Sequence, residues 1–146
     1  MNKNEYLIAL SESERTDLWR VEFAQQSEEQ KVFSAIWTLE SEVNNGGFDQ
    51  YFCNSGGDTA NFAPVALARI GADQCAAIVL KALRVVSAEP LPVDQDARVD
   101  LVTSLDETAV AGLGDLDTEF FEYPDDLTEL LFAFVHAHPD VFGRVE

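Results

Sequence analysis

The sequence predicts an all-α fold, a single-domain compact bundle of about six helices with a glycine-rich elbow. In most segments the apolar residues recur three and four positions apart, which is the period of an amphipathic helix. No segment shows the strict alternation of a half-buried strand. One stretch with two pairs of glycines separates two long helical patterns. A chain of 146 residues is most simply one domain, residues 1–146.

Two helices are predicted before the elbow. The first covers residues 11–24, because Ser11 and Glu14 have the spacing of a capping box and apolar residues follow them. Residues 1–10 are then expected to form a frayed terminus. The second helix covers residues 28–43. The helix dipole favours acidic residues in its first turn, and apolar residues follow at helical spacing.

The elbow is the stretch from Asn44 to Gly57. The paired glycines at its two ends can adopt positive φ, so the chain can turn sharply into the stretch and out of it. Between them, Phe48, Tyr51 and Phe52 fall at positions i, i+3 and i+4, one face of a short helix. We expect a rigid elbow whose aromatic face plugs the core.

Two further helices are predicted between the elbow and a proline-containing linker. The third runs from a cap at Asp58 or Thr59 to Gly71, a typical C-terminal stop. The fourth covers residues 73–86 and is apolar nearly all round, with one polar strip. This pattern predicts either the central helix of the bundle or a contribution to a subunit interface. The linker is Glu89–Pro92, because neither of its prolines can continue the helix.

The last part of the chain is predicted to hold two helices and a long loop. The fifth helix covers residues 94–112, and Arg98 within it points toward the apolar side, where its stem would snorkel. A loop follows over residues 112–124. The last helix opens at Asp125 or Asp126 and ends near His138 and Pro139. The apolar residues expected to anchor the loop in the core are Leu116, Phe120 and Phe121.

The charge of the chain limits its partners. Nine Lys and Arg residues against 27 Asp and Glu residues give a net charge of −18. This excess opposes direct binding of nucleic acid or anionic membranes and predicts a cationic partner. Residues 1–86 hold 7 basic and 12 acidic residues, a net of −5, whereas residues 87–146 hold 2 and 15, a net of −13. The second half therefore carries most of the acidity.

Ten carboxylates of the second half form the candidate binding surface. Asp96, Asp100 and Glu107 would line one side of the predicted fifth helix within about 40° of arc. An adjoining cluster would consist of Asp115, Asp117, Glu119, Glu122, Asp125, Asp126 and Glu129. Carboxylates one helical turn apart stand about 5 to 6 Å from each other, a spacing of the same scale as successive phosphates on a nucleic-acid strand.

Other kinds of site have little support. Cys53 and Cys75 lack a Cys-x-x-Cys spacing and fall on apolar faces, so we expect unreactive thiols. His136 and His138 point about 160° apart on a helix and cannot chelate one metal. We expect no metal, cofactor or enzymatic activity. The start of the chain lacks the features of a signal peptide, and no apolar run is long enough to span a membrane, so we expect a cytoplasmic protein.

The elbow carries a family resemblance. Its motif, of the type NGGFxQYFxNSxG, consists of Asn45, Gly46, Gly47, Phe48, Gln50, Tyr51, Phe52, Asn54, Ser55 and Gly57. With the late segment from Leu116 to Phe121, it resembles a family of small, acidic, all-helical bacterial proteins whose best-known member is a DNA mimic. The resemblance covers roughly residues 28–138. It implies a protein that imitates DNA, takes part in transcription regulation, and forms a homodimer.

The leading hypothesis is a non-enzymatic regulator whose carboxylates imitate DNA phosphates and occupy the basic surface of a transcription-factor-like DNA-binding protein. A second hypothesis is an acidic antitoxin or immunity-like partner of a basic enzyme. A third is a small-molecule-binding domain, or an enzyme, with a pocket at the elbow. The third would show an enclosed polar pocket around Asn45 and Gln50. The alternative for these amides is a structural role, in which they satisfy buried backbone groups at a tight turn.

Overall fold

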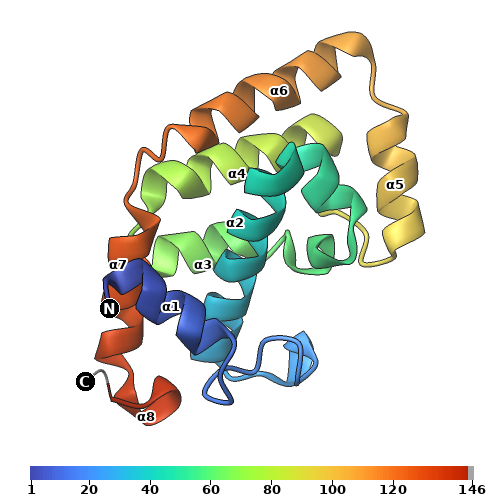
Figure 1. Ribbon diagram of the computed structural model, residues 1–146. Helices are drawn as coiled ribbons and strands as arrows, with labels where there is room; N and C mark the ends of the chain where they lie inside the picture. Colours follow the sequence, from blue (N-terminus) through green and yellow to red (C-terminus); the bar gives the residue numbers. More distant parts are fainter. Residues whose placement is uncertain (145–146) are drawn as a thin grey trace.

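A computed structural model of the chain describes residues 1–144, which contain helices and no strand (Figure 1). The α-helices are α1 (Lys3–Ser11), α2 (Glu28–Cys53), α3 (Ala63–Arg69), α4 (Asp73–Val86), α5 (Gln95–Thr103), α6 (Glu107–Phe121), α7 (Leu127–Ala137) and α8 (Pro139–Phe142). Two short 3₁₀-helices are η1 (Phe23–Gln25) and η2 (Ser55–Thr59). The predicted all-α fold is confirmed, with eight α-helices in the described part where about six were expected.

α2 is the helix around which the others are arranged. It contacts α3, α5, α6 and η2, and it runs through the middle of the molecule (Figure 1). Its apolar side chains from Val32 to Val43 are almost all fully buried. α4, for which a central place was considered, lies between α3 and α6, and its Leu80 is 45% exposed. Among residues 1–144, no helix is both long and apolar enough to cross a membrane.

The N-terminal helix begins earlier than predicted. Asn2 caps α1, because its side chain accepts a hydrogen bond from the backbone N–H of Glu5 (2.8 Å) and the Glu5 carboxylate accepts one from the backbone N–H of Asn2 (3.0 Å). Leu7 and Leu10 are buried, and α1 packs on α7. Residues 1–10 are therefore largely helical, and the predicted helix over residues 11–24 is wrong.

Two buried glutamines explain why the chain after α1 is not helical. The Gln30 amide donates to the carbonyl of Arg15 (3.0 Å) and accepts from the backbone N–H of Asp17 (3.0 Å). The Gln26 amide donates to the carbonyls of Asp17 (3.3 Å) and Val21 (3.0 Å). These bonds satisfy backbone groups that a helix would otherwise pair, so the loop is stable without helical hydrogen bonds.

The predicted elbow is confirmed at its first glycine pair, whereas Gly56 and Gly57 of the second pair lie in η2 and neither has a positive φ. Gly46 and Gly47 both leave the helical conformation, and Gly47 has a φ of +81°, which side-chain-bearing residues rarely adopt. The chain then resumes its helical course to Cys53. Phe48, Tyr51 and Phe52 are fully buried, as expected of an aromatic face that plugs the core.

The third helix begins later than predicted. η2 follows the elbow directly, and α3 starts only at Ala63, with Pro64 in its first turn, where a proline is tolerated. Gly71, with a φ of +86°, ends this helix as expected. α4 has the predicted bounds, 73–86, and the proline-containing linker follows it.

The predicted fifth helix over residues 94–112 and the loop over residues 112–124 are wrong. α5 ends at Thr103, and Asp106 caps a new helix, α6, by accepting a hydrogen bond from a first-turn N–H (2.8 Å). α6 continues through Gly112 and Gly114 to Phe121. A glycine inside a helix costs about 1 kcal/mol relative to alanine. Burial of Leu113, Leu116 and Phe120 on one face offsets that cost.

The C-terminal helix agrees with its prediction. Asp126 caps α7, because its carboxylate accepts a hydrogen bond from the backbone N–H of Glu129 (3.1 Å). Pro139 follows the helix end closely. Leu116 and Phe120 are buried as predicted, although they lie on α6 and not in a loop. Phe121 was expected to be a third anchor and is instead 48% exposed.

Candidate functional site

The ten predicted carboxylates fall into two groups. Within residues 1–144, six are exposed and have no side-chain hydrogen bond or ion pair: Asp96, Asp100, Glu107, Asp115, Glu119 and Glu122. The remaining four hold other parts of the chain: Asp117, Asp125, Asp126 and Glu129. The second group is therefore already engaged within the fold.

The predicted row of Asp96, Asp100 and Glu107 is broken. Asp96 and Asp100 lie one turn apart on α5, whereas Glu107 lies in the first turn of α6. The chain changes direction between the two helices, as Figure 1 shows, because the cap at Asp106 starts a new helix. The three side chains therefore cannot share one helical face.

The structure instead forms a row on α6. Glu107, Asp115, Glu119 and Glu122 are exposed and fall within about 120° of arc at 100° per residue. We call these four side chains the α6 row. At 1.5 Å per residue the row is about 22 Å long, a length over which one DNA strand carries about six phosphates. The pair on α5 brings the exposed carboxylates of the two helices to six.

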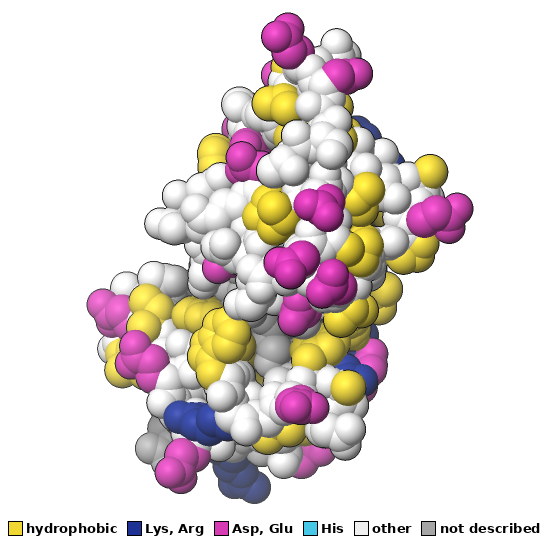
Figure 2. Space-filling model, turned by 90° about the vertical axis from the view of Figure 1, so that its right-hand side faces the viewer, with side chains coloured by type: hydrophobic (Ala, Val, Ile, Leu, Met, Phe, Trp, Pro, Cys, Tyr) yellow, Lys and Arg dark blue, Asp and Glu magenta, His cyan; other side chains and the backbone are white. Residues whose placement is uncertain are grey.

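The face at the α5 end of the molecule is rich in acidic side chains. Figure 2 shows Asp and Glu residues spread over this face, with the Lys and Arg residues mainly at its lower end and edges. The sequence explains this distribution, because Arg98 is the only Lys or Arg between residues 87 and 143. Arg98 is fully buried, so it adds no positive charge to the surface.

Asp117 and Asp125 bind backbone groups of other helices. The Asp117 carboxylate accepts a hydrogen bond from the backbone N–H of Phe48 (2.8 Å), where the helix resumes after the elbow. Asp125 does the same for the backbone N–H of Cys75 in the first turn of α4 (2.8 Å). Both carboxylates satisfy N–H groups that the start of a helix leaves without a partner. Burial raises the pKa of Asp117 above its ordinary value, and the nearby Asp49 carboxylate adds to the increase.

The amides of the elbow are paired with other side chains. Gln50 and Asn54 both donate to the Glu42 carboxylate, at 3.1 and 2.8 Å, and Asn44 donates to the hydroxyl of Tyr123 (2.6 Å). Asn45 is exposed. The partners are thus side chains, where the structural interpretation expected backbone groups. These bonds support a structural role for the elbow.

Two grooves of the described surface lie away from the centre of the elbow. One groove, of ≈ 730 Å³, lies between the loop around Trp19 and η2, and its lining includes Ser55 but neither Asn45 nor Gln50. Figure 2 shows a hollow flanked by hydrophobic side chains on this side of the molecule. A smaller pocket, of ≈ 180 Å³, lies between α1, α2 and α7, and its lining includes Asn44. Neither groove is the enclosed pocket around Asn45 and Gln50 that the small-molecule hypothesis requires.

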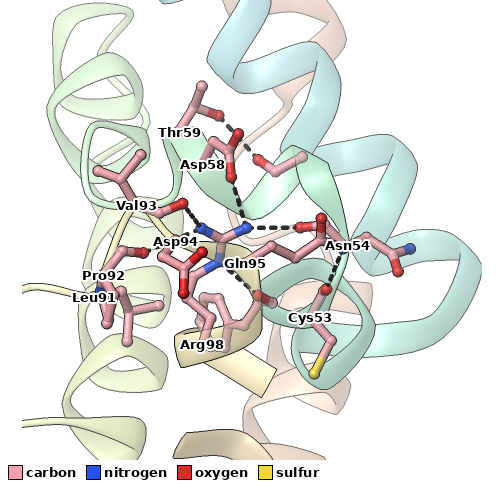
Figure 3. A network of polar contacts seen from close by, with 12 residues as sticks. Cys53, Asn54, Asp58, Thr59, Leu91, Pro92, Val93, Asp94, Gln95 and Arg98 are labelled. Atoms are coloured by element: carbon pink, nitrogen blue, oxygen red, sulfur yellow. Dashed lines mark hydrogen bonds and ion pairs between the residues drawn. The ribbon is translucent and has the colours of Figure 1, made fainter. Parts of the chain in front are cut away.

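Arg98 is the strongest polar feature that the sequence did not predict. Its side chain does not snorkel to the surface but is fully buried. All five of its N–H donors have an acceptor (Figure 3). The acceptors are the carbonyls of Phe52 (2.8 Å), Asn54 (3.0 Å), Pro92 (3.1 Å) and Val93 (2.6 Å) and the carboxylate of Asp58 (2.7 Å). We call this group the Arg98 joint.

The Arg98 joint explains Gly57, one glycine of the second pair of the elbow. Two of its carbonyls belong to the end of α2, where helix carbonyls lack intrahelical partners and attract a cation. A Cβ atom at Gly57 would lie 2.7 Å from the carbonyl oxygen of Tyr51 and 3.0 Å from Nε of Arg98. Only glycine lets η2 approach the end of α2 closely enough to complete the joint.

Fold and surface together define a small acidic helical protein with a glycine elbow and a free row of carboxylates. The family model described as DMP19-like protein matches residues 24–138. The chain therefore belongs to the DMP19-like protein family. The matched residues include the elbow, Arg98 and all ten predicted carboxylates, and they exclude α1. Comparisons with curated proteins and with solved structures gave no match.

Proposed function

We propose that this protein is a non-enzymatic cytoplasmic regulator of transcription, whose acidic surface occupies the basic DNA-binding surface of a partner protein. The observation that carries the proposal is the set of six exposed carboxylates on α5 and α6, which have no cation within residues 1–144 to neutralise them. The resemblance of the elbow motif to a family that includes a DNA mimic supports the same function. That resemblance also implies a homodimer, which sedimentation would test.

The mechanism would be competition with DNA. Basic proteins bind DNA largely through its phosphates, and a row of carboxylates at similar spacing offers the same Lys and Arg side chains an alternative partner. Net charge would steer the two proteins together, so association should be fast at low salt and slower as salt screens it. Solubility alone would need a net charge of only about 2 to 8 in magnitude for a small domain, well below the observed value.

Affinity capture at low salt from a native lysate, with the protein as bait, tests the proposal. We expect to recover a DNA-binding protein that unlabelled DNA displaces from the bait. A captured toxin-like enzyme that DNA does not displace would favour the antitoxin-like alternative and contradict the proposal.

Charge reversal then locates the surface. The variant Asp115→Lys/Glu119→Lys/Glu122→Lys should lose the partner. The matched control Glu12→Lys/Glu14→Lys/Glu22→Lys changes the net charge equally at exposed residues of the first half and should retain it. Equal loss in both variants would show that only bulk charge matters, and retention in both would overturn the proposal.

A further inference from the structure

The small pocket between α1, α2 and α7 has a size suited to one side chain. Its volume of ≈ 180 Å³ is below the roughly 300 to 1,000 Å³ of pockets that hold small-molecule ligands. Three elements supply its polar and aromatic lining: Trp37, Glu40, Ser41 and Asn44 from α2, Asn4 from α1 and Thr128 from α7. The α2 residues recur at helical spacing, so one face of that helix forms a wall.

Glu40 is held in a fixed position at this pocket. One of its carboxylate oxygens accepts a hydrogen bond from the Tyr123 hydroxyl (3.1 Å), which in turn accepts one from the Asn44 amide (2.6 Å). Tyr123 has a φ of +49°, an unusual conformation for a residue with a side chain. Such local strain is often found where a side chain must be placed for a function. The other Glu40 oxygen has no hydrogen-bond donor within residues 1–144.

The negative charge of Glu40 is not balanced within the described chain. The pocket lining contains no Lys, Arg or His. Lys3, beside Asn4, is already paired with Glu129 (2.7 Å). Burial raises the pKa of Glu40 above its ordinary value, and the charge of the nearby Asp126 adds to the increase. A half-buried carboxylate is usually paired with a cation, so a cation from outside the described chain is the expected partner.

The other lining residues indicate which cation fits. An arginine side chain carries a flat group with five N–H donors, which can stack on an aromatic ring and bind several oxygens at once. The pocket offers the Trp37 ring, the free Glu40 oxygen and the hydroxyl or amide oxygens of Ser41, Asn4 and Thr128. We propose that this pocket binds one arginine side chain of a partner protein, with the guanidinium against Trp37 and hydrogen-bonded to Glu40.

The pocket would act together with the acidic surface. Glu40 lies near Asp126, which follows the end of α6, so the pocket adjoins the acidic end of that helix. The α6 row would steer a basic partner by long-range attraction, and the pocket would anchor one arginine at short range. The assignment of this arginine to a DNA-binding protein rests on the proposed function. The evidence that the pocket binds an arginine side chain does not depend on that function.

A titration of the full-length, isotope-labelled protein followed by NMR tests the pocket without any partner. The probe is N-acetyl-arginine methylamide. It should give saturable shifts of the Trp37 indole N–H and the Asn44 side-chain amide. The neutral citrulline analogue, which has nearly the same shape, should not bind, and the lysine analogue should bind several-fold more weakly. Equal binding of the citrulline analogue would contradict the proposal that the pocket binds a cation. Equal binding of the lysine analogue would contradict its preference for arginine.

Glu40→Gln is the matched variant, because glutamine can still accept the Tyr123 hydrogen bond. The loss of one charged hydrogen bond should weaken binding of the arginine probe about tenfold or more. Glu14→Gln removes the same charge from an exposed carboxylate outside the α6 row and should leave the pocket affinity unchanged. Shifts that spread along the α6 row and persist in Glu40→Gln would show only general attraction and overturn the proposal.

The two proposals fail separately. If Glu40→Gln and wild type bind the probe alike while charge reversal on α6 abolishes capture of a DNA-binding protein, only the arginine pocket is wrong. If the pocket binds arginine while the α6 variant retains its partner, only the DNA-mimic function is wrong.

Discussion

The Arg98 joint and the α6 row are both highly polar, yet their charges serve opposite purposes. In the joint, one fully buried cation meets five acceptors from three segments of the chain. In the row, four carboxylates face solvent without a donor or a cation within residues 1–144. Groups that are satisfied internally contribute to folding, whereas groups that remain free are available for association. Substitutions in the two regions should therefore affect different measurements.

α6 contains the same contrast within one helix. The Asp117 carboxylate turns inward and binds the backbone of α2, while its neighbours Asp115 and Glu119 point outward. Residue type is identical for Asp115 and Asp117, so only their position around the helix decides the role. An acidic composition therefore does not by itself show which carboxylates form a binding surface.

The largest effect on stability is expected at the joint. Arg98→Met would remove the donor of the Phe52 carbonyl and four further hydrogen bonds of the joint, and should lower the free energy of unfolding by about 3 to 5 kcal/mol. Urea denaturation followed by circular dichroism measures this loss. Arg84→Met removes an exposed arginine from α4 and should change stability by no more than about 0.5 kcal/mol. Similar values for the two variants would contradict the assigned importance of the joint.

The second largest loss of stability is expected from a substitution in the elbow. Gly47→Val would place a branched side chain at a φ of +81°, with its Cβ 2.6 Å from the Asp117 carboxylate. A loss of about 2 to 4 kcal/mol is expected from strain and overpacking together. Gly112→Ala is the control, since a Cβ there meets no atom within 4 Å and α6 should gain about 0.5 to 1 kcal/mol. A melting temperature unchanged by Gly47→Val would show that the elbow does not require glycine.

The substitution Glu40→Gln should raise the melting temperature at neutral pH although it weakens binding of arginine. Because burial raises its pKa in the folded protein, the unfolded chain releases this proton first as pH rises. The stability that neutral Glu40 provides is thus complete below the unfolded-state pKa, about 4.3, and is lost as pH rises through the higher folded-state pKa. Glu40→Gln should therefore melt above wild type at pH 7, and the difference should shrink toward pH 4. A Glu40→Gln protein that melts below wild type at pH 7 would contradict this account.

The smallest and most general effect concerns salt. Because the acidic surface repels itself, moderate salt should raise the melting temperature of the isolated protein slightly, while it weakens capture of the basic partner. Melting curves and capture at 50 and 300 mM salt would measure both. A complex that strengthens with added salt would indicate an apolar interface in place of the α6 row.

The sequence by itself determined the fold class, the first turn of the elbow, the start of α2 and the positions of α4 and α7. Apolar spacing and glycine are local signals, and they located α4 and α7 and the buried aromatic face of Phe48, Tyr51 and Phe52. The same signals failed where two local rules competed. Gly112 and Gly114 indicated a loop, but the buried face of α6 outweighed them. Near the N-terminus the spacing of Ser11 and Glu14 indicated a helix start, whereas the capping box of the structure is formed by Asn2 and Glu5, which the sequence analysis did not consider.

Only the tertiary structure decided which polar groups are engaged and which are free. Asp117 meets its partner 69 residues away, Asp125 50 residues away, and Arg98 reaches Phe52 across 46 residues. Such pairs depend on how helices pack, and helical periodicity carries no information about that packing. The pocket at Glu40 likewise needs α1, α2 and α7 to come together. The sequence showed that the protein is acidic, and the packing selected the carboxylates that remain available to a partner.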